Sequence, residues 1–245
     1  MTVYETHLAA AERSAWPLET SVRWGDIDAA AARREEGVLA ALHDAAIIEG
    51  YLPVFAARLM QLLWDDVDAT AVLSLELYEG LRHYTALKRY LDAVGYAPAV
   101  LSEDGLVESR ARALAAPHSA DESIPMLTNF ACSELFAAYF FLRLSRETKE
   151  PVLAELLKLI ASDEFRHASA GADLLAKRVR ENPAVADDIL EAARHFRHYG
   201  ADVVEVPVAA ANDFEAIAAM NRLIRQACGV SPTQHLQGAL DAHNI

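Results

Sequence analysis

Hydrophobic residues recur every three or four positions along most of the chain, a pattern typical of amphipathic helices. The four longest runs of this pattern cover residues 36–64, 69–94, 122–145 and 151–180. Shorter runs cover residues 105–114, 185–198 and 214–227. Only residues 203–209 resemble a strand, and we expect an extended connector there. The pattern therefore predicts an all-α protein whose core is a bundle of four long helices, with additional helices toward the C-terminus.

The two ends of the chain lack such a run. Trp16-Pro17 and Trp24-Gly25 interrupt the first part, so we predict an N-terminal arm over residues 1–34 whose tryptophans lie over the bundle surface. The helical domain then covers residues 35–230, and residues 231–245 form a weakly patterned tail. Pro53 lies inside the first long run, where a missing backbone donor predicts a kink.

Composition and charge narrow the classes of function. The net charge of -14 argues against binding to nucleic acid or to an anionic membrane surface, because both carry negative charge. No run of 18 apolar residues is free of charges, and the first 15 residues lack a secretory signal pattern, so we expect no membrane span. Cys132 and Cys228 are the only cysteines, and we predict that both are reduced in a cytoplasmic protein.

The fourth long helix carries a pair of residues with metal-ligand chemistry. Glu164 and His167 are three positions apart, so they share one face of the helix. A Glu-x-x-His pair that points into a helical bundle is half of a carboxylate-bridged two-metal site. A solvated glutamate beside a packed histidine is an equally good interpretation of this pair alone.

Two further glutamates interrupt apolar segments. Glu134 is the only charged residue between Glu122 and Arg143, so a metal ion or a strong hydrogen-bond partner is the favoured interpretation. Glu49 has apolar neighbours close to Pro53, and its segment alone leaves open whether it points inward or to solvent.

The second long helix departs from the Glu-x-x-His spacing. Glu79 precedes His83 by four positions, and Gly80 stands three positions before the histidine. A glycine inside a helix costs roughly 0.5–1 kcal/mol relative to alanine, which indicates a specific reason for its presence.

The order of these residues along the four helices matches a di-metal carboxylate bundle. The chain resembles the acyl-carrier-protein desaturases of the ferritin-like superfamily, most clearly in residues 161–167 and 82–91 and at Glu49, which shortly precedes Leu52-Pro53. The resemblance covers most of residues 36–228 and implies a ferritin-like four-helix bundle.

The resemblance also implies a set of site residues. It implies five metal ligands, namely Glu49, His83, Glu134, Glu164 and His167. Asp163 matches the acid that holds the opposite histidine by its far ring nitrogen. Gly80 occupies the place of a family carboxylate, and Ala137 replaces a threonine used around bound oxygen. Glu79 then either reaches the metal through a π-bulge or holds His167 from behind, and we predict it as a sixth ligand.

The function implied by the resemblance is that of a desaturase-like, di-iron oxidase or oxygenase. Two iron ions, with manganese as an alternative at one position, would activate O2 to oxidise an apolar small molecule or an acyl chain. An external electron donor and a homodimer belong to the same implication. The alternative is a ferritin-like bundle whose centre has decayed and which binds other molecules. Gly80 and Ala137 favour this alternative, whereas the Asp163-Glu164 segment and Glu134 favour the enzyme, which we prefer.

An acyl carrier protein is the partner implied by the resemblance, because such carriers are acidic and dock on basic residues. Basic residues cluster at the end of the fourth helix and recur later, at Lys177, Arg178, Arg180, Arg194, Arg197, Arg222 and Arg225. Cations that complement a helix dipole are the alternative interpretation of the first three. Glu150, at the start of the same helix, is expected to be exposed.

Overall fold

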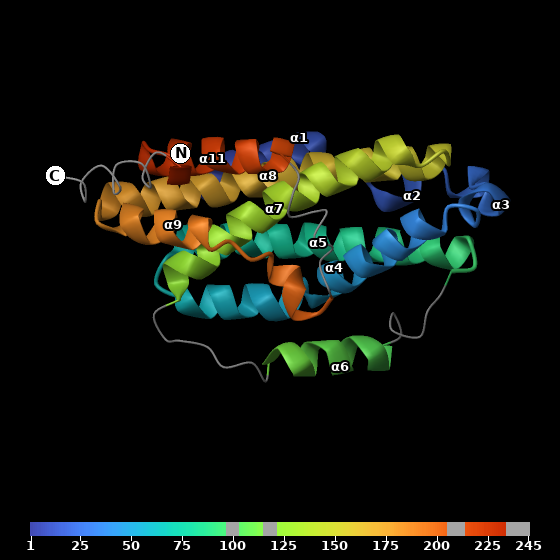
Figure 1. The fold of residues 1–245 in the computed structure, drawn as a ribbon, viewed down its shortest axis with the longest axis horizontal. Helices are drawn as coiled ribbons and strands as arrows, with labels where there is room; N and C mark the ends of the chain where they lie inside the picture. Colours follow the sequence, from blue (N-terminus) through green and yellow to red (C-terminus); the bar gives the residue numbers. More distant parts are fainter. Residues whose placement is uncertain (97–102, 115–121, 205–213, 234–245) are drawn as a thin grey trace.

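The computed structural model describes residues 1–96, 103–114, 122–204 and 214–233. Its centre is a bundle of four long helices, α4 (Glu36–Leu62), α5 (Val67–Ala93), α7 (Ser123–Glu147) and α8 (Pro151–Glu181). These helices run side by side along the long axis of the molecule (Figure 1). Their bounds lie within three residues of the four predicted runs.

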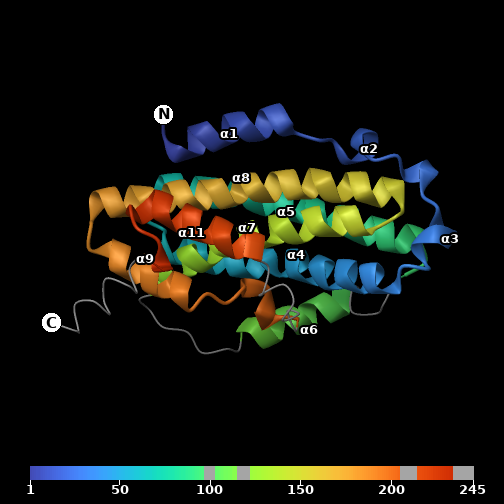
Figure 2. The same ribbon diagram turned by 45° about the horizontal axis from the view of Figure 1, so that its top comes forward.

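Shorter helices cover the outside of this bundle. They are α1 (Val3–Ser14), α2 (Leu18–Ser21), η1 (Trp24–Asp26), α3 (Ala29–Ala32), α6 (Glu103–Leu114), α9 (Val185–Arg194), η3 (Tyr199–Asp202) and α11 (Phe214–Cys228). Helix α1 lies along α5 and α8, while α9 and α11 pack against α7 and α8 (Figure 2). Helix α6 packs against α4. Of the strand-like residues 203–209, those from 205 onward lie outside the described residues, as does the tail beyond residue 233.

The N-terminal arm is fixed to the bundle by polar contacts. The carboxylate of Asp68 accepts hydrogen bonds from the backbone N–H groups of Val3 and Tyr4 at 3.2 and 2.8 Å. His7 Nε2 lies 2.9 Å from Asp173 Oδ2 on α8. Trp16 is only 4% exposed, so it lies inside the protein and not over its surface as expected.

The starts of α5 and α8 follow from their capping residues. Asp66 accepts a hydrogen bond from Ala69 N at 3.0 Å, and Glu150 accepts from the N–H groups of Val152 and Leu153. Glu150 also accepts from Tyr90 Oη–H at 3.1 Å and is fully buried. The expectation that Glu150 is exposed was therefore wrong, because the residue serves as a cap in the interior.

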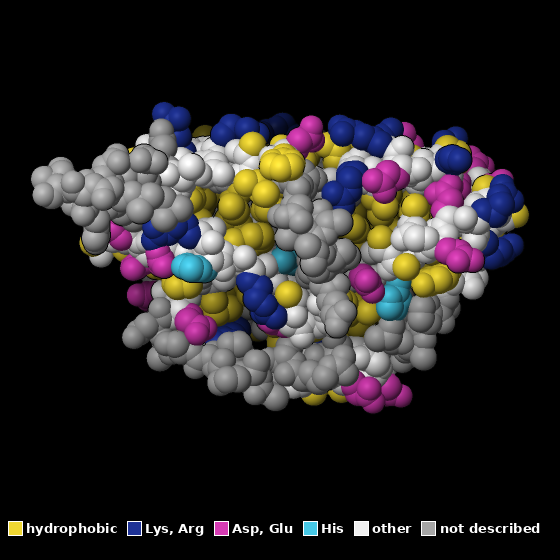
Figure 3. Space-filling view, in the orientation of Figure 1, with side chains coloured by type: hydrophobic (Ala, Val, Ile, Leu, Met, Phe, Trp, Pro, Cys, Tyr) yellow, Lys and Arg dark blue, Asp and Glu magenta, His cyan; other side chains and the backbone are white. Residues whose placement is uncertain are grey.

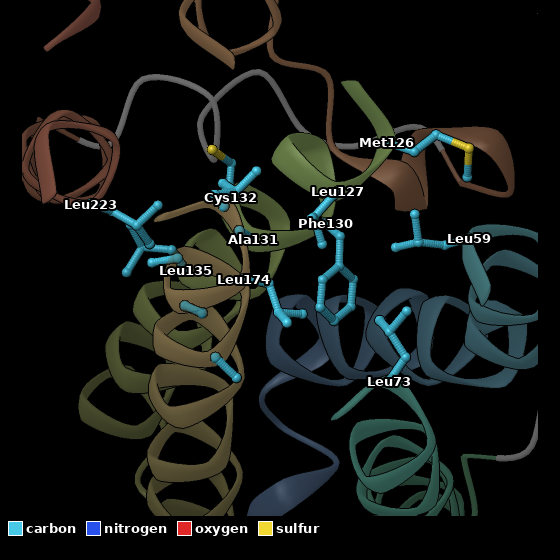
Figure 4. Close-up of a cluster of buried hydrophobic side chains, with 14 of the residues drawn as sticks. Leu59, Leu73, Met126, Leu127, Phe130, Ala131, Cys132, Leu135, Leu174 and Leu223 are labelled. Atoms are coloured by element: carbon cyan, nitrogen blue, oxygen red, sulfur yellow. The ribbon is translucent and has the colours of Figure 1, made fainter. Parts of the chain in front are cut away.

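Two hydrophobic clusters fill the bundle, one on each side of a central polar layer. In the first, Phe130 of α7 lies among Leu59, Leu73 and Leu174 from the other three long helices (Figure 4). The second cluster contains Leu42, Leu87, Phe141, Leu153 and Leu157, among other residues. The predicted site residues lie between these two clusters on all four long helices.

Helices α4 and α7 are long and apolar enough, by length and composition alone, to cross a membrane. Their most apolar windows are 56% and 67% buried inside the bundle. This is the burial expected of the core helices of a bundle, which pass the same test of composition. Cys132 and Cys228 are both free.

Candidate metal centre

The central layer of the bundle is a group of buried acids and histidines. Five of the predicted ligands converge there, none of them more than 5% exposed, namely Glu49, His83, Glu134, Glu164 and His167. One ligand atom from each of Glu49, His83 and Glu164 lies within 4.8 Å of the others, and the same holds for Glu134, Glu164 and His167. The structure thus forms two adjoining groups of metal-ligand type that share Glu164.

Glu164 lies between the two histidines. Its Oε1 atom is 2.8 Å from His83 Nδ1, and its Oε2 atom is 3.1 Å from His167 Nδ1. Helix α8 brings Glu164 and His167 to the same inward face because they are one turn apart. Ile160 and Ala168 continue that face into the two hydrophobic clusters.

An acid holds each histidine from behind. His83 Nε2 lies 3.1 Å from Asp163 Oδ2, and His167 Nε2 lies 3.0 Å from Glu79 Oε2. A carboxylate at Nε2 favours the proton on that nitrogen and leaves the lone pair of Nδ1 facing the centre. Metal-ligating histidines are commonly oriented in this way.

Glu79 therefore lies behind His167, the second of the two positions that the sequence left open for it, and not at the metal position. It lies behind His167 and outside both groups of ligand atoms, so the geometry differs from its predicted role as a sixth ligand. Helix α5 is α-helical throughout Val67–Ala93, without the π-bulge that would turn Glu79 inward.

Two arginines join the acids behind the histidines. Arg166 binds Glu79 at 2.6 Å and Asp163 at 2.5 Å, and Arg82 binds Asp163 at 2.8 Å and Glu79 at 3.2 Å. Burial opposes ionisation of Glu79, but hydrogen bonds with His167 and Arg166 outweigh it and lower the pKa of Glu79 to about 2. Burial likewise opposes ionisation of Asp163, whose pKa the contact with His83 helps lower to about 2.

The sequence interpretation missed these arginines. A repeated pattern of acid-x-x-Arg-His identifies them, since Glu79 precedes Arg82-His83 as Asp163 precedes Arg166-His167. The repeat places an acid and an arginine at equivalent positions on α5 and α8. It therefore encodes the two-fold similarity of the site.

The inner residues compete for protons. Burial and the charge of Glu164 raise the pKa of Glu49 to about 8. Burial alone would lower the pKa of His83, but Glu164, Asp163 and Glu49 outweigh it and raise that pKa to about 9. Burial and the charge of Glu164 also raise the pKa of Glu134. Without metal ions, the centre therefore holds protons between its carboxylates and imidazoles.

These residues fit a pair of metal ions. His83 Nδ1 is buried and, among the described residues, has no hydrogen bond of good geometry, although Glu164 Oε1 is only 2.8 Å away. A nitrogen lone pair and a carboxylate oxygen repel each other, so they approach this closely only when a proton or a cation binds to both. Carboxylates and imidazoles are the donor set that suits iron and manganese.

Gly80 faces this centre, but its position is filled by a neighbour. A Cβ atom at Gly80 would lie 2.3 Å from Leu52 Cδ2 and 3.2 Å from Glu49 Oε2. The side chain of Leu52 therefore takes the space in which the resemblance places a family carboxylate.

Trp16 adds the N-terminal arm to the site. Its Nε1–H donates to Asp163 Oδ2 at 2.6 Å, and its ring is stacked on His83 with centroids 6.0 Å apart. The Arg82 guanidinium lies 4.5 Å from the centroid of the same ring. The sequence interpretation missed this contact, because nothing in the local pattern connects Trp16 with a helix 147 residues away.

A cavity of about 530 Å³ extends from the centre toward the C-terminal segments. Its lining is mostly apolar and includes Ile48, Phe136, Ala137, Phe140, Phe196 and Met220, with Glu49 and Tyr199 among the polar members. Hydrophobic side chains are also exposed between charged ones on the face shown in Figure 3.

Two residues after α9 connect this cavity to the centre. Tyr199 Oη–H donates to Glu134 Oε1 at 3.1 Å, and its ring stacks on Phe55. His198 lines the cavity and accepts a hydrogen bond from Gly200 N at 2.9 Å. Burial lowers the pKa of His198 to about 4.

Fold and site together define a ferritin-like, all-α bundle with carboxylate and histidine groups suited to two metal ions. The R2-like ligand-binding oxidase from Sulfolobus acidocaldarius has a similar structure, with a TM-score of 0.64 and 16% sequence identity over 95% of this chain and 93% of that chain. This likeness confirms the predicted fold class. No protein-family model and no curated protein sequence matches the chain. The likeness to desaturases stays a prediction.

Proposed function

We propose that this protein is a di-metal oxidoreductase that uses O2 to oxidise an apolar substrate. The observation that carries the proposal is the matched pair of histidines, each held at Nε2 by an acid and turned at Nδ1 toward Glu164. A bundle that had lost its metal centre would have no reason to keep these five buried ionisable groups, two histidines and three acids, in this arrangement.

The residues divide into two ligand sets. Glu49 and His83 would hold one ion, Glu134 and His167 the other, and Glu164 would contact both. Two iron ions, or iron with manganese at one position, would supply the electrons for reduction of O2. Asp163 and Glu79 orient the imidazole rings, and the hydrophobic clusters on either side exclude water.

The cavity supports an apolar substrate. Its aromatic and aliphatic lining meets the centre at Glu49, so a bound molecule would place a C–H bond beside the metal ligands. The solved structure of similar fold is described as a ligand-binding oxidase, which agrees with a cavity of this kind. An acyl chain is one substrate of suitable shape and polarity.

Two further partners are considered, an external electron donor and an acyl carrier protein. Oxidation of a C–H bond with full reduction of O2 takes two electrons from the substrate and two from elsewhere, so an external electron donor belongs to the proposal. Carrier docking at the end of α8 is less favoured, since Lys177 and Arg178 bind Asp66 at 2.7 and 3.2 Å. Arg194 and Arg197 are paired with Glu191 and Asp202, so the exposed Arg180, Arg222 and Arg225 remain for such a contact.

Oxygen uptake tests this function. Protein loaded with Fe2+ under anaerobic conditions should consume O2 on mixing, faster than the same iron in buffer, and long-chain acyl compounds should change that rate. A Glu164→Ala variant, which removes the carboxylate shared by both sets, should not consume O2 faster than free iron. Uptake by the wild-type protein at the rate of free iron would favour a decayed centre over the oxidase.

A further inference from the structure

We infer that Glu76 is a further metal ligand of this centre, one that supplies the carboxylate missing at Gly80. The inference rests on the proposed di-metal function and concerns a residue outside the predicted set. The carboxylate oxygens of Glu76, like those of Glu79, are not among the two groups of ligand atoms, and as a ligand Glu76 would add a fourth protein donor, from α5, to the group of Glu134, Glu164 and His167.

Glu76 is a buried acid to which the described part of the chain offers no hydrogen-bond partner. It is 3% exposed, and among the described residues neither of its carboxylate oxygens has a hydrogen-bond partner. An unpaired buried carboxyl group destabilises a fold, so native proteins rarely keep one without a ligand or a function. The other buried acids of the layer all contact a histidine, an arginine or a tyrosine.

The helix register directs Glu76 toward the centre. It precedes Gly80 by four positions and His83 by seven, so at about 100° per residue all three lie on one face of α5. Its electrostatic neighbours are His167, Glu164, Glu79 and Arg166, which places it on the His167 side of the centre. Burial, the largest cause, raises its pKa to about 8, as expected for a carboxyl group without a bound cation.

Gly80 explains why a ligand at position 76 is needed. Leu52 Cδ2 occupies the space where a side chain at position 80 would begin, so no carboxylate can enter the centre from there without repacking. Glu76 is the nearest acid on the same face of α5 that is not already bound to an arginine.

Charge balance supports the same assignment. The outer acids, Glu79 and Asp163, are balanced by Arg82 and Arg166. Two divalent ions would bring four positive charges into the layer, and Glu49, Glu134 and Glu164 balance only three of them. An ionised Glu76 balances the fourth, which matters because an uncompensated buried charge is costly.

Cobalt titration of the metal-free protein tests the inference. The absorption of bound Co2+ reports its ligands, so wild-type protein and the Glu76→Gln and Glu76→Leu variants are titrated and followed by absorption and by thermal unfolding. Glutamine keeps the shape of the side chain, and leucine removes every oxygen donor. Glu134→Gln is the positive control for loss of a ligand, and Asp92→Asn, exposed near the end of the same helix, is the matched negative control.

We expect both Glu76 variants to lose the second Co2+ ion as fully as Glu134→Gln does, with a changed spectrum, and to bind the first ion as wild type does. A loss of only about 10–100-fold would overturn the ligand role and indicate a residue that orients a ligand from behind. Their metal-free forms should melt no lower than the wild-type metal-free form, because an unpaired buried carboxyl group has been removed. Wild-type affinity for both ions in the variants would overturn the role of Glu76 and leave the di-metal function standing. Lower melting of the metal-free variants, with both ions weakened equally, would also overturn it and indicate a structural role. Failure of wild-type protein to bind cobalt would overturn both proposals.

Discussion

His83 Nε2 lies 3.1 Å from Oδ2 of Asp163, and this contact turns the opposite ring nitrogen toward Glu164. The same relationship joins His167 to Glu79 at 3.0 Å, so each half of the bundle supplies the acid that orients the histidine of the other half. Asp163 and Glu79 therefore determine which nitrogen of each histidine faces the centre.

Loss of either acid should weaken metal binding without removing a ligand. An Asp163→Asn or Glu79→Gln change should lower metal affinity about 10–100-fold, because each histidine loses its charged partner. Equilibrium titration with Mn2+ or Co2+ measures this effect. If Glu79→Gln instead removes the binding of one metal ion as fully as Glu164→Ala does, Glu79 is a metal ligand, as the sequence interpretation predicted.

The proton balance of the centre predicts a pH dependence. The folded metal-free protein holds a proton on His83 with a pKa of about 9, above the 6.5 that is usual for a histidine. That proton contributes stability that is fully present below about pH 6.5 and is lost as pH rises through 9. Glu49, whose pKa is raised to about 8, acts in the same direction.

The melting temperature of the metal-free protein should therefore fall between pH 6.5 and 9, while metal affinity should rise, since fewer protons compete for the ligands. Calorimetry in two buffers of different ionisation enthalpy should also show proton release on metal binding at pH 7. Metal affinity that is constant across this range would contradict the protonated centre.

The close contact between Gly80 and Leu52 predicts coupling between these positions. Alanine at position 80 gains roughly 0.5–1 kcal/mol of helix propensity but forces Leu52 to move, a strain that typically costs about 1–3 kcal/mol. Gly80→Ala should therefore lower the free energy of unfolding measured in urea. In a Leu52→Ala background the same change should cost less, and equal costs in both backgrounds would show that the two residues do not compete for space.

Trp16 predicts a role for the N-terminal arm in the stability of the site. Trp16→Phe removes the indole donor to Asp163, a hydrogen bond to a charged group worth about 1.5–3 kcal/mol. We expect a loss of that size in unfolding free energy, together with weaker metal binding. Trp24→Phe is the matched control, since Trp24 Nε1 donates to the backbone of Leu18 and has no contact with the acids of the site.

The sequence predicted the four long helices well because each has an apolar stripe along its length, broken mainly by the site residues, and a defined start or stop. The convergence of Glu134, Glu164 and His167 was predicted from the order of such residues along the four helices and from the family resemblance, since the Glu164 and His167 pair alone left a solvated glutamate as an equally good interpretation. The roles of Glu79 and Glu76 were harder to predict. Helical spacing places both acids near the same face of α5, and only the packing of the bundle determines which of them points to the centre. Trp16, His198 and Tyr199 depend on contacts between distant segments, which periodicity does not encode.

The occupancy of the buried layer by two metal ions is the property on which the proposed function depends. Its most direct measurement is the metal content of protein loaded with Fe2+ under anaerobic conditions, desalted and analysed by mass spectrometry, with Glu164→Ala and the exposed Asp92→Asn variant treated in the same way. We expect close to two ions per chain for wild type and Asp92→Asn, and a clear loss for Glu164→Ala. Wild-type protein that retains no metal, or the same amount as Glu164→Ala, would contradict this expectation.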